Sequence, residues 1–316
     1  MQDTFEMWDR LPPELKLETV QNLSNRDLVN LAQTSKYHFA LFQPLLDDRK
    51  LAAFLQCVVQ GKHDKVKLLL KDDISLILKK GKVTDYSGRE FKNVSGFEYA
   101  LWALDKHMWV NILACIPSNE NGRKVFTSLV AQYEKVKTDG ITYKLNGKII
   151  TEKHFDFKNT LIKELQTQVD LINAPGDKDE DVIDKQWREG VGGAQKLLPI
   201  HIVYEYCSYA QFYPPKFISQ PKSSQQFINR ITKKYEDWFD VNSKLGFEFA
   251  IYKGIQNYIQ VLRDSNDGRR WGLCYDLDAM TELCRIRTKD LLELKSKFEE
   301  QMSPDNRYRV FQTTHC

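Results

Sequence analysis

Apolar residues recur at intervals of three and four along most of this chain, which is the spacing that places side chains on one face of an α-helix. The pattern predicts three short helices between Leu11 and Leu46, and an antiparallel helix pair over Leu51–Lys71 that turns at Gly61. A second pair is expected over Phe97–Ile116, and three helices are expected over residues 224–301. The expected fold class is therefore mainly α.

Two segments depart from the helical pattern. Residues 140–151 contain two β-rich runs on either side of Asn146-Gly147, a strong signal for a two-residue hairpin turn, so one small β-hairpin is expected there. The acidic run Asp177–Asp184 follows a Pro-Gly pair and precedes the glycine-rich Gly190–Gly193. A solvated loop is expected near residues 174–193.

Composition narrows the class of protein. The 316 residues carry 46 Lys and Arg against 43 Asp and Glu, and the net charge of +3 creates no chain-wide field for nucleic acid. Hydrophobic residues make up 42% of the chain, which is enough to bury a sizeable core. No apolar run approaches the roughly 20 residues of a membrane-spanning helix. Met1–Arg10 has acids and no apolar core, so no Sec-type signal peptide is expected.

The cysteines point away from metal chemistry. None of the six forms a C-x-x-C pair, and zinc modules need such close pairs to chelate one ion. Their scattered placement fits a reducing compartment, with most of them serving as small core residues. No metal and no cofactor are expected. The six are Cys57, Cys115, Cys207, Cys274, Cys284 and Cys316.

The most catalytic-looking cluster is His201, Glu205 and Cys207. On a helix the first two share a face, whereas Cys207 points elsewhere, and the H-E-x-x-H pattern is absent. A core histidine and a core cysteine are favoured over a nucleophile pair, and no catalytic residue is assigned. Gly190–Gly193 lacks the Gly-Lys-Ser/Thr of a phosphate loop, so a flexible turn is favoured there.

Residues 206–235 contain no acid, and their five basic residues are interleaved with aromatic ones. Such a stretch can hold single-stranded nucleic acid, but a solvated face or a patch that meets an acidic protein or lipid is favoured at this low net charge. Three residues in and after this stretch are the candidate target-binding set: Lys233, Lys234 and Trp271.

The N-terminal residues resemble the F-box without a gap. The match comprises Leu11-Pro12-x-Glu14-Leu15, Leu23, Asp27-Leu28, Leu31, Thr34-Ser35 and Phe39. F-boxes are three-helix modules that dock on the Skp-type subunit of SCF ubiquitin ligases. The resemblance implies a docking face made of Leu11, Pro12, Leu15, Leu23, Leu28 and Leu31. Thr19 stands where the family usually has a large aliphatic residue, which would weaken docking.

The middle of the chain resembles degenerate ankyrin repeats. Gly61 followed by the Val66-x-x-Leu69-Leu70 pattern is similar to the second half of one repeat. With Val83–Phe91 and Gly192–Cys207, the order of modules resembles effector proteins of intracellular bacteria. The expected division is 1–50 F-box-like, 51–120 ankyrin-like helix pairs and 121–316 an α-rich C-terminal region.

The resemblance implies an adaptor and not an enzyme. The F-box would dock the Skp-type subunit, and residues from about 51 onward would hold a host target protein. Two alternatives stay open: a non-ligase interaction module whose F-box-like helices pack internally, and an enzyme that uses His201 or Cys207. The protein is expected to be made in the bacterial cytoplasm and delivered to the host cytosol.

Overall fold

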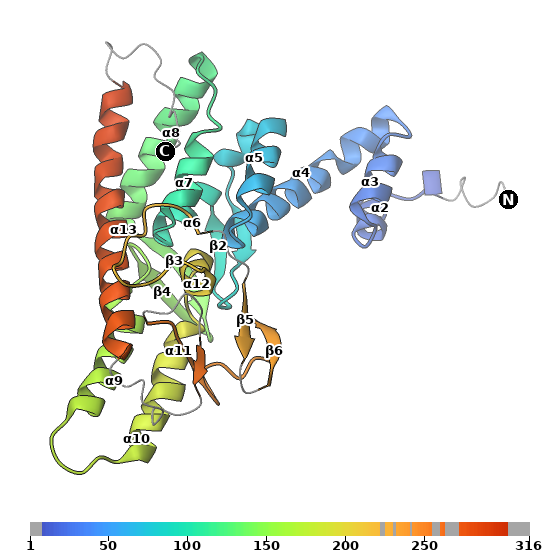
Figure 1. Cartoon of the computed structure of the whole chain (residues 1–316). Helices are drawn as coiled ribbons and strands as arrows, with labels where there is room; N and C mark the ends of the chain where they lie inside the picture. Colours follow the sequence, from blue (N-terminus) through green and yellow to red (C-terminus); the bar gives the residue numbers. More distant parts are fainter. Residues whose placement is uncertain are drawn as a thin grey trace.

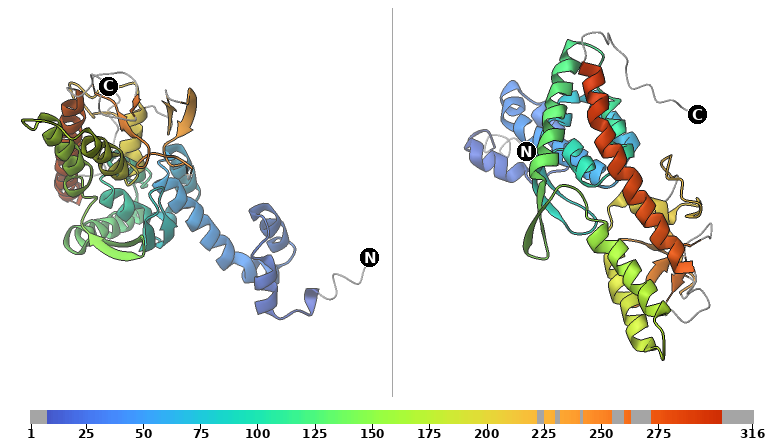
Figure 2. Two further views of the ribbon diagram at one scale, coloured as in Figure 1. Left: turned by 90° about the horizontal axis from the view of Figure 1, so that it is seen from below. Right: turned by 90° about the vertical axis from the view of Figure 1, so that its left-hand side faces the viewer.

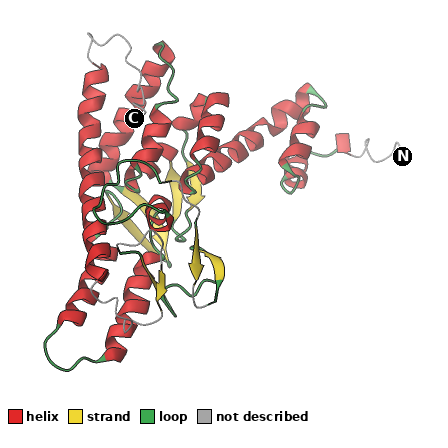
Figure 3. Cartoon of the chain, in the orientation of Figure 1, coloured by secondary structure: helices red, strands yellow, loops and turns green. Residues whose placement is uncertain are grey.

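The computed structural model describes residues 8–221, 225–229, 232–240, 242–254, 260–262 and 272–302. Helices make up most of this part of the chain, and the strands lie among them in the body of the molecule (Figures 1 and 3). The N-terminal helices project away from that body, and two further views show the same arrangement (Figure 2). The expectation of a mainly α fold with a small antiparallel sheet is confirmed.

The N-terminal quarter of the chain is helical, as predicted. Two helices that the sequence pattern separates are one helix in the structure. The elements of this quarter are α2 (Pro13–Val20), α3 (Asn25–Ala32), α4 (Lys36–Val59), α5 (His63–Asp72) and the 3₁₀ turn η1 (Ile74–Ile77). The expected third short helix and the first helix of the next pair are one 24-residue helix, α4. Pro44 lies inside α4, and a proline there normally signals a break. Gly61 closes the α4–α5 turn with a positive φ of 66°.

A four-stranded antiparallel sheet follows in the order β1-β2-β3-β4. The strands are β1 (Gly81–Thr84), β2 (Glu90–Val94), β3 (Ile141–Leu145) and β4 (Lys148–Glu152). The predicted hairpin is β3–β4, and Asn146 and Gly147 both have the positive φ that its tight turn requires. The hairpin β1–β2 was not predicted, although Phe91 and Val94 face the core. The β1–β2 hairpin lies between the helix pair α4–α5 and the next two helices. The two helix pairs therefore do not follow each other directly, as ankyrin repeats would.

Three helices continue the body: α6 (Gly96–Trp102), α7 (Lys106–Leu113) and α8 (Glu120–Asp139). Helix α6 contacts β3 of the sheet, and the other two contact α6. Ser95 caps α6 with a reciprocal capping box to Glu98, and Asp105 caps α7 by accepting the Met108 N–H. Every residue of α6 is buried, so this helix is the centre of the body.

The expected loop near residues 174–193 is helical from Glu180 onward. Here α9 (Lys163–Asn173), preceded by the π-helical η2 (Lys158–Ile162), is followed by α10 (Glu180–Lys185), the π-helical η3 (Gln186–Val191), α11 (Gly192–Gln195) and α12 (Ile200–Cys207). Asp179 accepts the Val182 N–H, and acidic residues in a first turn are favourable against the helix dipole. Gly192 is not in a flexible turn, because a Cβ there would lie 2.7 Å from the Phe249 carbonyl oxygen.

The expectation of three helices over residues 224–301 is wrong. The described part of this stretch contains strands β5 (Gln226–Asn229), β6 (Lys234–Asp237), β7 (Ala250–Tyr252) and β8 (Gln260–Leu262), then the single helix α13 (Leu273–Met302). β5 and β6 pair in one antiparallel hairpin, and β7 and β8 in another. In β5, buried Phe227 alternates with exposed Ile228, which is the period of a half-buried strand.

The described chain has two hydrophobic cores that meet along α4. The smaller core lies between α2, α3 and the first half of α4, and its fully buried members are Val20, Leu28, Ala32 and Phe42. The larger core fills the body and reaches the second half of α4 through Phe54, Leu55, Val58 and Val59. One helix thus carries the N-terminal module at one end and is buried in the body at the other (Figure 2).

Candidate partner-docking site

The turn between α2 and α3 is held onto α4 by one arginine. Arg49 donates from Nη1 to the Leu23 carbonyl at 2.8 Å, and from Nη2 to the Gln21 carbonyl at 2.6 Å and the Val20 carbonyl at 3.3 Å. These carbonyls lie at the C-terminal end of α2, where a positive charge is favourable. Ser24 then starts α3 by accepting the Asp27 N–H. These hydrogen bonds fix the α2–α3 turn against α4.

Apolar side chains remain exposed on this module. Leu15 is 46% exposed and Phe39 is 52% exposed, and Val29 and Tyr37 are exposed as well. Four large apolar side chains are thus exposed on three neighbouring helices of one small module. Exposed apolar surface of this kind marks interaction sites. Nothing in the described body covers them, because the module projects away from it (Figure 1).

The structure divides the six predicted docking residues into three groups. Pro12 and Leu15 are exposed, and Leu11 is half-buried. Leu23 and Leu31 are also half-buried and pack at the edge of the small core. Leu28 is fully buried beneath them. The sequence reasoning did not include Val29, Tyr37 and Phe39 in the set. These three residues could have been found in the sequence, because they are apolar residues on the faces of α3 and α4 that lie opposite the core positions.

Comparisons with known proteins agree with this geometry. The family model for the F-box domain matches residues 8–37, which span α2, α3 and the start of α4. A second model, the CBUA0006 C-terminal domain, matches residues 160–298. The relative "Uncharacterized protein CBUA0006" of Coxiella burnetii (strain RSA 493 / Nine Mile phase I) is 35% identical over 278 residues, which cover 80% of this chain and 77% of the relative.

The chain belongs to the CBUA0006 family. No solved structure matches it. Its F-box domain is a non-catalytic protein–protein interaction module.

Two sequence motifs of this CBUA0006-family chain meet inside the body. Arg89, from the Val83–Phe91 motif, donates from Nη1 to the Leu197 carbonyl at 2.8 Å in the Gly192–Cys207 motif. Its guanidinium lies 5.3–5.4 Å from the ring centroids of Trp102, Tyr143 and Phe155. Both motifs therefore hold the body together and need no ligand to explain them.

The His201, Glu205 and Cys207 cluster has no catalytic arrangement. His201 Nε2 lies 2.7 Å from the Ala103 carbonyl, and burial lowers the pKa of this imidazole. Burial raises the pKa of the Cys207 thiol to about 12, so the nucleophilic thiolate is not formed near neutral pH. The geometry supports the core histidine and core cysteine that the sequence favoured.

Glu205 belongs to a buried polar network that joins α12 to α13. Its Oε1 lies 3.6 Å from a guanidinium nitrogen of buried Arg287, and burial raises the pKa of this carboxyl to about 7. Arg287 also contacts Asp290 at 3.3 Å and His107 at 3.0 Å. Burial and the neighbouring Arg287 lower the pKa of His107 to about 3.

A second buried set lies beside it. Lys253 Nζ donates to the carbonyl of Ser208 at 2.9 Å and to its hydroxyl at 3.1 Å. Burial lowers the pKa of Lys253 to about 8. Asp276, in the first turn of α13, accepts the N–H groups of Lys253 at 3.1 Å and Gly254 at 2.5 Å. Each charged group is thus hydrogen-bonded within the fold, as buried charges must be.

The remaining candidates concern metal binding, membrane insertion and the target-binding set. Among the described residues, no three His, Cys, Asp or Glu side chains are arranged to hold a metal ion. No described helix is long and apolar enough to cross a membrane. Lys233 and Lys234 lie exposed at the β5–β6 turn, where Lys233 has a φ of 60°. Trp271 lies outside the described residues.

Proposed function

We propose that this protein is an adaptor whose F-box docks the Skp-type subunit of an SCF ubiquitin ligase while its body holds a second protein. One observation carries the proposal: the F-box module has a core of its own, projects on α4, and leaves Leu15 and Phe39 about half exposed. In the alternative with internally packed helices, these side chains would lie against the body. Covering one such side chain with a partner is worth up to about 1.5–3 kcal/mol.

The docking test replaces one exposed side chain without touching the core. We expect Leu15→Asp to weaken binding of a purified Skp-type subunit at least about tenfold, because a buried carboxylate would face apolar surface. Leu68→Asp is the matched control, since Leu68 is 67% exposed on α5, in the body. Calorimetric titration measures the affinity, and circular dichroism checks that both variants are folded. The proposal fails if the unchanged protein shows no binding at micromolar concentrations.

We also propose that Lys233 and Lys234 contact the target protein. Both lysines are exposed, and Tyr235 beside them is exposed as well, which combines positive charge with an aromatic anchor. Charge reversal, Lys233→Glu with Lys234→Glu, should weaken target capture at low salt and leave Skp-type binding unchanged. Quantitative pull-down from host lysate at two salt concentrations measures both. Unchanged capture at low salt would place the target surface elsewhere.

We further propose that the protein acts as an effector in the host cytosol. The support is its resemblance to effectors of intracellular bacteria, together with an F-box whose implied partner is a host protein. A reporter enzyme fused to the chain should give signal in the host cytosol during infection. Signal confined to the bacteria would contradict this proposal.

An adaptor of this kind needs no catalytic residue of its own. The enzyme alternative used His201 or Cys207, and both side chains are held in the core with shifted pKa values that suit packing. Replacing Cys207 by Ala is therefore expected to leave partner binding intact.

A further inference from the structure

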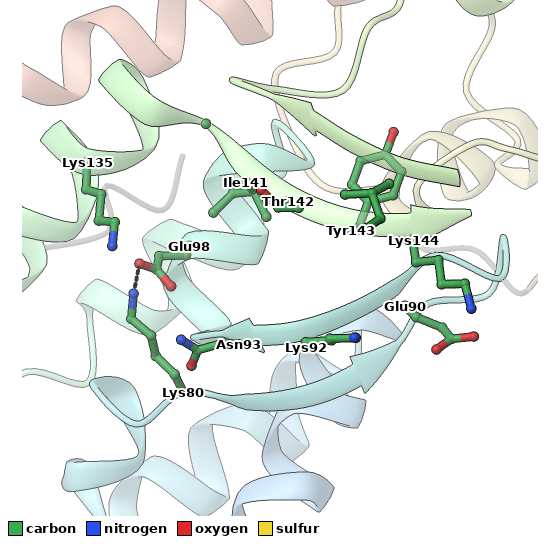
Figure 4. Close-up of a pocket in the computed structure, with 12 residues that line it drawn as sticks. Lys80, Glu90, Lys92, Asn93, Glu98, Lys135, Ile141, Thr142, Tyr143 and Lys144 are labelled. Atoms are coloured by element: carbon green, nitrogen blue, oxygen red, sulfur yellow. Dashed lines mark hydrogen bonds and ion pairs between the residues drawn. The ribbon is translucent and has the colours of Figure 1, made fainter. Parts of the chain in front are cut away.

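The central sheet opens between its two middle strands. β3 and β4 pair along five residues, whereas β2 and β3 pair only at Glu90 and Lys144. Beyond that pair, the backbone edges of residues 92–94 and 141–143 are not joined to each other. A pocket of about 340 Å³ lies at this opening, and it also reaches Lys135 on α8 (Figure 4).

The pocket carries an excess of positive charge. Four lysines and two glutamates line it: Lys80, Lys92, Lys135, Lys144, Glu90 and Glu98. Both glutamates have a cationic neighbour, because buried Glu98 forms an ion pair with Lys80, and Glu90 lies across the ladder from Lys144. Within the described chain, Lys92 and Lys135 have no carboxylate within ion-pair distance. The pocket therefore offers two uncompensated ammonium groups.

The pocket also has an apolar side. Ile141 is buried at its floor, and Ile149 on the edge strand β4 is 76% exposed. Lysines and apolar groups lie along the opening, on α8, β2 and β3, instead of converging on one point (Figure 4). A single small anion could not contact all of them, whereas an extended chain with several acidic groups could.

We propose that this pocket binds an extended acidic peptide segment of a partner protein. Lys92 and Lys135 would pair with its carboxylates, and Ile149, which lies opposite Lys144 in the β3–β4 ladder, would contact an apolar side chain farther along the peptide. In an extended peptide, alternate side chains point to the same face, so carboxylates two residues apart can follow lysines that are spaced along the opening. This inference rests on the proposed adaptor function for the identity of the partner, which would be the target protein held by the body. Peptide binding itself does not depend on that function.

The test needs no ligase subunit, so its failure is distinguishable from failure of the docking proposal. The probe is a short fluorescein-labelled peptide with glutamates at alternate positions and one valine on the same face as the glutamates, and the matched probe has glutamine in place of glutamate. Fluorescence anisotropy with the full chain at low ionic strength should show saturable binding of the glutamate peptide alone. Lys92→Glu with Lys135→Glu should weaken that binding at least about tenfold.

Two control variants separate this site from general attraction. Lys65→Glu with Lys67→Glu makes the same change in net charge at two exposed positions on α5, outside both proposed binding surfaces, and should leave the affinity unchanged. Ile149→Ala changes no charge and should weaken binding severalfold. Equal weakening by both double variants would overturn the proposal, as would an Ile149→Ala affinity equal to that of the unchanged protein. Full displacement of the peptide by millimolar inorganic phosphate would overturn it in favour of a small-anion site.

Discussion

At the scale of single residues, burial decides which ionisable groups can do chemistry. Burial raises the pKa values of Glu205, Asp276 and Cys207 and lowers that of His201. Glu205, Asp276 and His201 are buried in the body, and Cys207 is half-buried against its core. Perturbed pKa values are a sign of active sites, but interior hydrogen-bond networks perturb them as well. Here the partners are backbone groups and buried arginine and lysine, which favours a structural role.

The raised pKa of Glu205 predicts a measurable dependence of stability on pH. The unfolded chain releases this proton near pH 4.5, while the folded protein keeps it until about pH 7. The stabilising contribution is therefore present below pH 4.5 and is lost as the pH rises through 7. We expect Glu205→Gln to remove this loss. As the pH rises from 4.5 to 7, the difference in unfolding free energy between the variant and the unchanged protein should shift in favour of the variant by up to about 1.4 kcal/mol per pH unit.

Urea unfolding at several pH values between 4.5 and 7 measures the difference. Buried His107 and His201 titrate with the opposite sign, and their contribution cancels because it is common to both proteins. Exposed Glu18→Gln serves as the control and should run parallel to the unchanged protein. Parallel curves for Glu205→Gln as well would mean that this carboxyl titrates normally.

At the scale of elements, α13 closes the body. Its far end places Phe298 against Phe126, Tyr133 and Phe97, with ring centroids 5.1, 5.6 and 6.4 Å apart. An ion pair between Asp290 and Lys106, at 2.6 Å, joins the same helix to α7. The C-terminal helix is therefore part of the core and not an appended tail.

Truncating that aromatic contact should be costly. We expect Phe298→Ala to lower the unfolding free energy by about 3–5 kcal/mol, because it removes a buried ring and leaves a cavity. Leu292→Ala on the same helix, where Leu292 is 56% exposed, should change it by less than about 0.5 kcal/mol. Denaturant unfolding followed by tryptophan fluorescence measures both. A similar cost for the two variants would show that α13 adds little through Phe298.

At the scale of the whole molecule, two cores of unequal size share one helix. The smaller one consists of a few side chains between α2, α3 and the first half of α4. So small a core gives little stability by itself, and local opening of one part of a protein is then easier than global unfolding. A docking partner that covers the exposed face would stabilise this module most.

The two cores should separate in hydrogen exchange. Leu28→Ala removes a fully buried side chain from the small core and should cost that module about 2–5 kcal/mol. Amides of α2 and α3 should then exchange much faster, while those of α6 and α7 keep their protection. Val29→Ala, at the exposed neighbouring position, should change neither set. Equal acceleration in both modules would show that they unfold as one unit.

The sequence by itself determined the features whose causes are local. The turn at Gly61 and the tight turn at Asn146-Gly147 depend on neighbouring residues, and each occurs where its signal predicts. The F-box was recognisable because its pattern is continuous from Leu11 to Phe39.

The other features of the fold and the candidate sites depend on residues that are far apart in the sequence, so only the tertiary structure shows them. The hairpins β1–β2, β5–β6 and β7–β8 are short, and each packs on an element that is distant in the sequence: β1 contacts α4, β5 contacts β8 and β7 contacts α11. The periodicity of α2 and α3 shows that Leu15 and Leu28 are both apolar, but only the position of α4 makes one exposed and the other core. The lysine pocket has the same origin, since its charges come from α6, α8, β2, β3 and the residue before β1, and only folding brings them together.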